Sequence, residues 1–435
     1  MNDTKPIKTQ AGTFVVSCLG CKVNQAEAAH LIRELTQRGW SQAGANETVD
    51  LAIVFTCAVT GAAARQSRQA ARRLARTHPQ ARVVVTSCGV QVEAQAFIDQ
   101  GFSVLGRADM GNLPHLVSSP TQEPSQEPGP PDSGPWVPGI RYAGEGRSRA
   151  LLKVQDGCNA GCAYCIVPLT RGRPRSLPLE KACSAFAALG EAGSAEVVLT
   201  GVHLGRYGAD LEDKTDLAAL IEALLASHPL PRIRLSSLEV NEISDSLIDL
   251  LAYHPRVCRH LHIPLQSGSD RLLRAMGRPY QARDFASQVE QLHEKVEGIC
   301  LGADVLAGLP GEDQQAFDQT RALIQNLPLS YLHVFPFSSR PGTRAAAMPG
   351  APPEQTVKQR AATLRELGQA KRLLFLEKQP GNRPWAVMEH SDMARTDNYC
   401  LVRVKQPPPP GSLTQILIQG LRQTPKGPQL TGIVI

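Results

Sequence analysis

Short runs of branched apolar residues alternate with longer segments along the first quarter of the chain. The runs cover residues 14–16, 51–54 and 83–85, and the segments between them repeat their apolar positions at helical spacing. Strands that alternate with helices in this way usually lie parallel in one sheet. The pattern therefore predicts a Rossmann-like α/β domain over residues 11–117.

The same alternation fills the middle of the chain. Six more strand-like runs, with helical segments between them, lie near 151–154, 196–200, 232–236, 259–263, 300–309 and 331–337. Six βα units are too few to close an eight-stranded barrel. We therefore expect residues 144–376 to form an open, partial (β/α)6 barrel with its site at the carboxyl ends of the strands.

Two regions do not follow this pattern. Residues 118–143 are rich in Pro, Ser, Gly and Gln, which predicts a linker. Residues 377–435 carry short alternating runs separated by Pro and Gly turns, at 385–389, 399–404, 413–418 and 430–435. We expect a small antiparallel β-barrel there.

Composition and charge narrow the class of protein. The 435 residues carry a formal net charge of +6, which permits a nucleic-acid partner without requiring one. No apolar run is long enough to span a bilayer, and the first ten residues lack the apolar core of a signal peptide, so we expect a cytoplasmic protein with no membrane partner. In a reducing compartment, 11 cysteines favour metal or redox chemistry over disulfides.

Three cysteines lie close together in the segment CNAGCAYC. Cys158, Cys162 and Cys165 are separated by three and then two residues, in a loop after the strand-like run at 151–154. Three thiols at this spacing can bind three irons of an iron–sulfur cube and leave the fourth iron open. A structural zinc site is the alternative, but it usually needs a second CxxC or a His pair, and neither follows Cys165.

Three more cysteines follow the three strand-like runs of the first domain. Cys21, Cys57 and Cys88 each come within a few residues of a run's end. Because parallel strands bring their carboxyl ends to one edge, these thiols can meet at one point. On spacing alone, small buried core cysteines are an equally good interpretation of Cys57 and Cys88. Cys18 forms a CxxC with Cys21 and could exchange with it as a ligand.

The CNAGCAYC segment, with Tyr164 before its last cysteine, resembles the signature of radical S-adenosylmethionine enzymes. The resemblance extends to the methylthiotransferases of that superfamily, through motifs that follow in order: GCKVN, TCAVT, VQDGCNAGCAYCIVP, RGRPRS, LTGVHLGRYG, RLSSLEVNEI, HIPLQSGSD, DVLAGLPGE and HVFPFSSRPGTRA. Two residues depart from the family pattern. Phe55 stands where an Asn is usual before Thr-Cys, and Ser87 replaces a usual Gly before the third cysteine.

This resemblance implies the cofactors and their ligands. It implies two [4Fe–4S] clusters, one on Cys158, Cys162 and Cys165 and an auxiliary one on Cys21, Cys57 and Cys88, with Cys18 left as a structural residue. It also implies S-adenosyl-L-methionine, with cofactor-binding residues at the carboxyl ends of the barrel strands: Tyr164, Thr200, Gly201, Ser237, Glu239, Gln266 and Ser267. The resemblance does not imply a catalytic role for any particular side chain.

The resemblance further implies a reaction. GCKVN and LTGVHLG are similar to the branch that methylthiolates C2 of N6-threonylcarbamoyladenosine at position 37, beside the tRNA anticodon. The alternatives are N6-isopentenyladenosine in tRNA and a ribosomal protein aspartate. The implied partners are the tRNA anticodon loop, a flavodoxin- or ferredoxin-like electron donor and an unknown sulfur donor, with a TRAM-like RNA-binding module at the C-terminus. A non-catalytic iron–sulfur protein that binds RNA or carries electrons is a rival from another class, but it has no use for the cofactor-pocket motifs.

The remaining candidates have weaker patterns. A stripe of four arginines on one helix face contacts either solvent or RNA phosphates: Arg65, Arg68, Arg72 and Arg76. Arg171 and Arg173 bind either an anionic group or a structural carboxylate. His260 and His262 are more often satisfied core residues than catalytic ones. Four cysteines without ligand spacing are interpreted as structural: Cys183, Cys258, Cys300 and Cys400.

Overall fold

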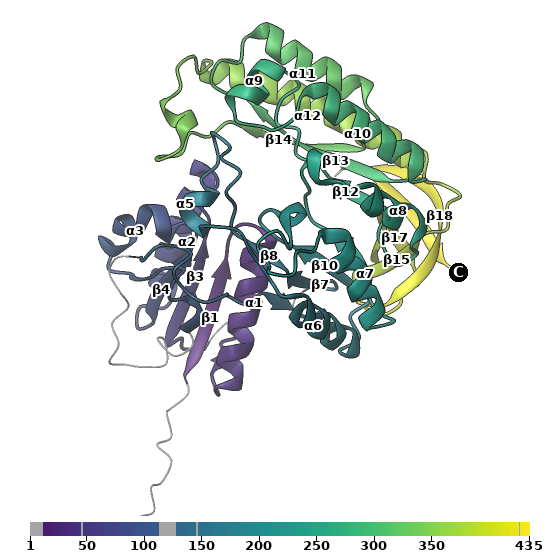
Figure 1. The fold of residues 1–435 in the computed structure, drawn as a ribbon. Helices are drawn as coiled ribbons and strands as arrows, with labels where there is room; N and C mark the ends of the chain where they lie inside the picture. Colours follow the sequence, from purple (N-terminus) through teal and green to yellow (C-terminus); the bar gives the residue numbers. More distant parts are fainter. Residues whose placement is uncertain (1–11, 45–46, 113–127, 145–146, 426) are drawn as a thin grey trace, which may run out of the picture. The chain divides into compact units, whose positions relative to one another are not determined.

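A computed structural model describes residues 12–44, 47–112, 128–144, 147–425 and 427–435 (Figure 1). The start of the chain and part of the predicted linker, residues 118–127, lie outside the described residues. The chain divides into two compact units, the first formed by Met1–Gly139 with Ile166–Gly172, the second by Ile140–Cys165 with Arg173–Ile435. In the part of the chain that the structure describes, no helix combines the length and the apolar character needed to cross a membrane.

The first unit is built on a parallel five-stranded sheet. Its order is β2-β1-β3-β4-β5, with strands β1 (Thr13–Cys18), β2 (Ser41–Gln42), β3 (Leu51–Thr56), β4 (Arg82–Ser87) and β5 (Ser103–Leu105). Its helices are α1 (Lys22–Gln37), α2 (Gly61–Thr77), α3 (Val90–Ile98), η1 (Met110–Asn112) and α5 (Val167–Arg171).

Strand β3 shows why this sheet forms. All six of its residues, LAIVFT, are buried, as expected of a parallel strand covered on both faces. Ile53 and Phe55 pack in a cluster with Leu31 and Leu35 of α1. The alternate residues Ala52 and Val54 pack in a second cluster with α2 and α3 side chains. The predicted Rossmann-like α/β fold is therefore confirmed.

The second unit begins with six parallel strands in two hydrogen-bonded groups. One group pairs in the order β7 (Ala150–Lys153), β10 (Glu196–Thr200) and β11 (Arg232–Leu235), and the other in the order β12 (His260–His262), β13 (Cys300–Ala307) and β14 (Tyr331–Pro336). β11 reaches the β12 side through a parallel bridge between Ile233 and Val257. Short β6 (Ile140–Arg141) runs antiparallel beside β7, and β8 (Gln155–Asp156) pairs with β9 (Arg175–Ser176).

Helices cover one face of this sheet, as the partial barrel predicts. They are α6 (Leu179–Glu191), η2 (Leu204–Arg206), α7 (Leu217–Ser227), η3 (Val240–Glu242), α8 (Asp245–Tyr253), α9 (Asp270–Ala275), α10 (Ala282–Lys295), α11 (Gln314–Asn326), η4 (Arg344–Ala347) and α12 (Glu354–Glu377). One continuous apolar core joins strand residues such as Leu199 and Val305 to helix residues such as Phe186 and Phe285. The prediction of an open (β/α)6 barrel is confirmed.

A closed β-barrel ends the second unit. Its order is β15-β16-β17-β19-β18, with strands β15 (Trp385–His390), β16 (Met393–Thr396), β17 (Leu401–Lys405), β18 (Leu413–Thr424) and β19 (Gly427–Val434). The expectation of an entirely antiparallel barrel was wrong, because β17 and β19 pair in parallel to close it. The sequence pattern marks strands but not which of them become neighbours.

Buried charges tie this barrel to the open sheet. Arg232 and Arg234 of β11 flank Glu196 of β10, with closest N–O distances of 2.7 Å. The outer nitrogens of the same arginines donate to backbone carbonyls of the barrel, including Arg395 O at 3.0 Å and Thr396 O at 2.8 Å. Burial opposes the charge of Glu196, but the arginines outweigh it and hold the pKa of its carboxyl well below the usual range.

We expect Glu196→Gln to destabilise the second unit by roughly 3–5 kcal/mol, because it leaves buried arginine charge uncompensated. The lowered pKa means that the intact network contributes fully at neutral pH and loses its contribution only as the pH falls into the acid range. The change is measured as a shift of the urea midpoint. Glu354→Gln, at an exposed ion pair with Lys358, is the matched control and should leave the midpoint unchanged. An equal midpoint for both variants would contradict the account.

Candidate active site

The first unit brings three of its thiols to the carboxyl edge of its sheet. Cys21 lies just beyond β1 at the start of α1, Cys57 follows β3, and Cys88 follows β4. These three strands are neighbours in the sheet. A Cβ atom on Gly20 would lie 3.2 Å from the Cys57 sulfur, so the loop before Cys21 passes directly over Cys57. Burial, helped by the nearby thiolates of Cys88 and Cys21, raises the pKa of Cys57 to about 11.

Cys18 belongs to β1 itself, opposite Phe55 in the sheet register. The loop that leads into Cys21 contacts Cys57, since a Cβ atom on Gly20 would lie 3.2 Å from the Cys57 sulfur. This geometry favours Cys21 over Cys18 as the partner of Cys57.

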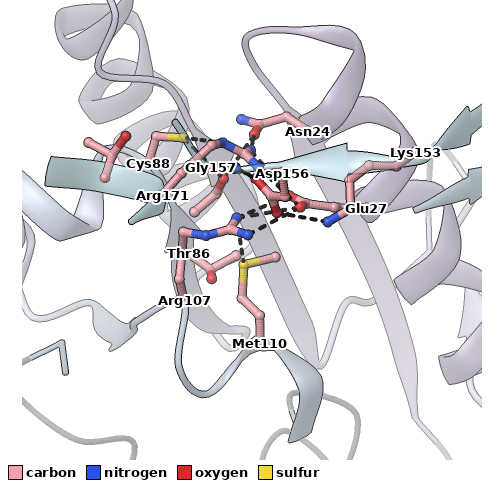
Figure 2. A network of polar contacts seen from close by, with 12 residues as sticks. Asn24, Glu27, Thr86, Cys88, Arg107, Met110, Lys153, Asp156, Gly157 and Arg171 are labelled. Atoms are coloured by element: carbon pink, nitrogen blue, oxygen red, sulfur yellow. Dashed lines mark hydrogen bonds and ion pairs between the residues drawn. The ribbon is translucent and has the colours of Figure 1, made fainter. Parts of the chain in front are cut away.

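A buried polar network surrounds Cys88 (Figure 2). Arg171 donates from Nε to the Cys88 sulfur at 3.2 Å and pairs through Nη1 with Glu27 Oε1, also at 3.2 Å. Arg107 contacts the same Glu27 carboxylate at 3.4 Å. All three charged side chains are at most 2% exposed. Arg171 places a cationic donor directly against the Cys88 sulfur, which favours a thiolate or an anionic cluster there.

Asn24 and Ser87 fix the loops that carry the thiols. The Asn24 amide donates to the carbonyls of Leu19 at 2.9 Å and Thr56 at 3.0 Å. Its oxygen accepts from Ser87 Oγ at 3.0 Å. Ser87 has a φ of 77°, in the left-handed region that favours glycine, which explains why glycine is usual at this position. The bond to Asn24 offsets part of the strain that serine meets there.

The second unit holds the CNAGCAYC loop through contacts from its own distant segments. Ala163 donates to Met276 O at 2.8 Å and accepts from Ala345 N at 2.8 Å. Arg344 donates to Gly161 O at 2.6 Å. Cys158, Cys162 and Cys165 are all partly exposed, as ligands of a cluster that meets substrate must be.

Two cationic side chains contact these thiols. Cys158 Sγ lies 3.2 Å from His203 Nδ1, and His203 Nε2 lies 2.9 Å from Glu242 Oε1. Burial opposes protonation of His203, but Cys158 and Glu242 outweigh it and raise its pKa to about 10. Arg278 donates to Cys162 Sγ at 3.3 Å. Both contacts stabilise sulfur in its anionic form.

Arg278 also links two of the predicted cofactor-binding residues. It donates to the Tyr164 hydroxyl at 3.3 Å and forms an ion pair with Glu239. The structure therefore places Tyr164, Glu239 and Cys162 around one buried guanidinium. Neither Arg278 nor His203 was singled out from the sequence. His203 lies within the motif LTGVHLGRYG, whereas Arg278 lies eight positions after the end of HIPLQSGSD.

The other predicted cofactor-binding residues lie at strand ends on the same edge. Thr200 ends β10, and a Cβ on Gly201 would lie 2.9 Å from the Gln155 side chain, so the turn has no room for a side chain. Ser237 follows β11 and is exposed. Gln266 has a φ of 66° and bridges to Val305. Ser267 bonds Thr320 and the amide of Ser269, so its hydroxyl shapes the turn.

Comparison with known proteins identifies the family. Residues 152–324 match the radical SAM superfamily, and residues 13–105 match a family described as uncharacterized protein family UPF0004. The threonylcarbamoyladenosine tRNA methylthiotransferase MtaB of Aquifex aeolicus (strain VF5) is 32% identical over 413 residues, 92% of this chain and 98% of that protein. The protein of the same name from Rickettsia prowazekii (strain Madrid E) is 33% identical, over 88% of this chain and 90% of that protein. The chain belongs to the radical S-adenosylmethionine methylthiotransferase family.

Two further comparisons concern a relative with a different name and a solved structure with a similar fold. The tRNA-2-methylthio-N(6)-dimethylallyladenosine synthase of Chlorobium phaeobacteroides (strain DSM 266 / SMG 266 / 2430) is 30% identical over 94% of this chain and 95% of that protein. Among solved structures, the radical S-adenosylmethionine methyltransferase TsrM of Kitasatospora setae aligns with a TM-score of 0.57 and 15% identity, over 77% of this chain and 73% of that one. That likeness supports the fold alone.

The residues of this methylthiotransferase fit the cofactors of its family. Radical SAM enzymes use S-adenosylmethionine and a [4Fe–4S] cluster, and three partly exposed thiols with cationic neighbours form a suitable donor set. When bound, the cluster and S-adenosylmethionine supply a carbon radical. Cys158, Cys162 and Cys165 would hold the cluster. Membership of this family also removes the rival interpretation of a non-catalytic electron carrier.

Arg278→Met should slow reductive cleavage of S-adenosylmethionine by about 10–100-fold, the usual loss when a residue that orients metal ligands is removed. The variant removes the donor to Cys162 and Tyr164 and leaves Glu239 without its cation. The measurement is the rate of 5′-deoxyadenosine formation with dithionite, under anaerobic conditions. Arg274→Met, at an exposed arginine of α9, is the control. An unchanged rate for Arg278→Met would contradict this role.

Proposed function

We propose that this enzyme methylthiolates C2 of N6-threonylcarbamoyladenosine at position 37 of tRNA and uses two [4Fe–4S] clusters to do so. The substrate proposal rests on the relatives that share about a third of its residues along nearly the whole chain and carry this activity in their names. The proposal of a second cluster rests on one observation, the three thiols gathered at one sheet edge of the first unit beside the buried Arg171.

Each unit has its own part in this proposal. Cys158, Cys162 and Cys165 would hold the cluster used with S-adenosylmethionine, whose cleavage leads to hydrogen removal from C2 of the adenine. Cys21, Cys57 and Cys88 would hold the auxiliary cluster that supplies sulfur, with the methyl group coming from a second S-adenosylmethionine. The protein residues orient these groups and exclude water. Tyr164, Thr200, Gly201, Ser237, Glu239, Gln266 and Ser267 remain proposed cofactor-binding residues.

Partners follow from the same proposal. A flavodoxin- or ferredoxin-like protein would supply electrons. The anticodon loop would present adenosine 37 splayed out of its stack, since a radical acts only on a base it can reach. On helix α2, three arginines of the stripe are exposed and available to phosphates, namely Arg65, Arg72 and Arg76, whereas Arg68 pairs with Glu93. The closed barrel β15–β19 would serve as the TRAM-like RNA-binding module.

A second substrate is suggested by the relative that acts on dimethylallyladenosine, whose identity of 30% is close to that of the others. Mass spectrometry of tRNA nucleosides from a strain lacking this gene separates the two. We expect the 2-methylthio form of threonylcarbamoyladenosine to disappear while the isopentenyl counterpart stays. The reverse pattern would assign the second substrate, and intact levels of both would overturn the proposal.

A further inference from the structure

One face of the sheet β12-β13-β14 carries a cluster of ionisable side chains that are not among the proposed cofactor-binding residues. Leu301, Ala303 and Val305 of β13 point into the core beneath the helices. Because strand residues alternate between faces, Asp304 points to the opposite face. Asp304 lies directly opposite His333 in the register, and His262 ends the neighbouring strand.

The three side chains are in contact. His262 Nε2 lies 2.7 Å from Asp304 Oδ1, and His333 Nδ1 lies 3.4 Å from the same oxygen. The two imidazole rings stack with centroids 4.8 Å apart. Burial opposes the charge of Asp304, but the two adjacent histidines outweigh it and hold the pKa of the carboxyl well below its usual range. Asp304 is therefore an ionised acceptor at neutral pH.

The hydroxyl group of Tyr331 contacts two histidines of β12. The Tyr331 hydroxyl lies 3.1 Å from His262 Nδ1 and 2.9 Å from His260 Nε2. Tyr331 can cross β13 only because residue 302 is glycine, since a Cβ there would lie 2.1 Å from the tyrosine ring. Tyr331 thereby fixes the ring of His262 and directs its other nitrogen toward Asp304.

The cluster is open where it meets solvent. Both histidines use Oδ1 of Asp304, and among the described residues no hydrogen bond or ion pair engages Oδ2. The side chain of Asp304 is 25% exposed and that of His333 is 55% exposed. Phe335, two residues further along β14, is 42% exposed. One ionised acceptor thus lies beside two exposed rings.

A groove next to this cluster also combines aromatic rings with charged side chains. It has a volume of about 370 Å³ and is lined by the rings of Tyr331, His333 and Tyr399 together with Arg365 and Arg372. Aromatic faces combined with arginines are typical of sites that bind single-stranded nucleic acid, where rings stack on bases and cations meet phosphates.

We propose that this face binds the target nucleobase: Asp304 accepts a hydrogen bond from a base N–H, and the exposed ring of His333 stacks on the base. The inference rests on the proposed function, in which the substrate is an adenosine of RNA. An adenine with an N6 substituent keeps N–H donors beside its ring, and an ionised carboxylate is a strong acceptor for them. A divalent cation is a different occupant for two imidazoles and a carboxylate. The direct contact of 2.7 Å between His262 and Asp304 favours the pairing without an ion.

The test measures binding of two anticodon stem-loop RNAs to the reconstituted enzyme by fluorescence anisotropy. One RNA carries N6-threonylcarbamoyladenosine at position 37, and the other has no base at that position. Wild type should bind the first RNA about tenfold more tightly, in line with the loss of one stacked and hydrogen-bonded base. Asp304→Asn and His333→Ala should bind both RNAs with the affinity that wild type shows for the abasic one. Asp318→Asn, at a partly exposed ion pair on α11, is the matched control and should keep the wild-type ratio.

The urea midpoint and the iron content of each variant, compared with those of wild type, verify that it is folded and loaded. A wild-type affinity ratio in both Asp304→Asn and His333→Ala would overturn the inference. The inference would also be overturned if metal analysis found one equivalent of a divalent metal in wild type and none in the His262→Ala variant. If wild type makes methylthio product but either of these two overturning results is found, the inference about the nucleobase fails while the proposed function stands. If wild type makes no product from a base-containing RNA, the proposed function fails with it.

Discussion

Replacing Cys21, Cys57 and Cys88 together by alanine should abolish the methylthio product while cleavage of S-adenosylmethionine continues. The three thiols lie in the first unit, whereas the CNAGCAYC loop is held by contacts within the second. Loss of the first set should therefore leave the radical chemistry intact and remove only the source of sulfur. The measurement is the yield of 5′-deoxyadenosine and of 2-methylthio nucleoside from one reaction.

Two cysteine variants serve as controls for this result. Cys18→Ala and Cys183→Ala should both retain product, because Cys18 belongs to strand β1 and Cys183 lies in α6. Equal loss of 5′-deoxyadenosine in the triple variant would show that the two sets of thiols act as one site, against this account. Product from the triple variant would show that the sulfur comes from elsewhere.

Arg171→Met should reduce the methylthio product by about 10–100-fold, since it removes the donor to the Cys88 sulfur. Hydrogen bonds and positive charge beside cluster sulfurs favour the reduced state, so the variant should also show a more negative midpoint potential for the first-unit cluster. The formation of 5′-deoxyadenosine should persist. Potentiometric titration followed by electron paramagnetic resonance measures the shift.

Arg173→Met is the matched control, because Arg173 lies two residues away and is exposed. Glu27 keeps Arg107 when Arg171 is lost, so the buried carboxylate retains one cation. Arg171→Lys should restore charge but not the directed Nε–H donor, and its potential should lie between those of wild type and Arg171→Met. A potential that is the same in wild type and Arg171→Met would remove Arg171 from the cluster environment.

The sequence predicted those features that repeat locally. Strand β3 is buried throughout, and Cys21, Cys57 and Cys88 each follow one of the neighbouring strands β1, β3 and β4, so periodicity predicted that they lie at one edge of the sheet. Their assignment as cluster ligands came from the resemblance. The CNAGCAYC loop could be recognised from the spacing of its own three cysteines. The expectation of a wholly antiparallel C-terminal barrel was wrong, because strand polarity is set by which strands become neighbours, and β17 and β19 pair in parallel.

Arg171 was a candidate for binding an anionic group or a carboxylate, but the partners of the residues around the thiols were not predicted, because they are remote in sequence. Arg171 and Glu27 are separated by 144 positions, and Arg278 and Cys162 by 116. A single arginine carries no periodic signal, and only the fold selects which carboxylate or sulfur it meets. The same holds for Asp304, whose neighbours His262 and His333 come from separate strands. Strand alternation predicted that His262 lies on one face of its strand. Which side chains from neighbouring strands share that face depends on the order of the strands in the sheet, which the sequence pattern does not give.

The claim of two clusters is tested most directly by iron and sulfide analysis with Mössbauer spectra of anaerobically reconstituted protein. Wild type should bind about eight irons as [4Fe–4S] centres, and the two triple variants, Cys21/Cys57/Cys88→Ala and Cys158/Cys162/Cys165→Ala, about four each. About four irons in wild type, with none left in the Cys158/Cys162/Cys165→Ala variant, would contradict the account, because the first unit would then hold no cluster.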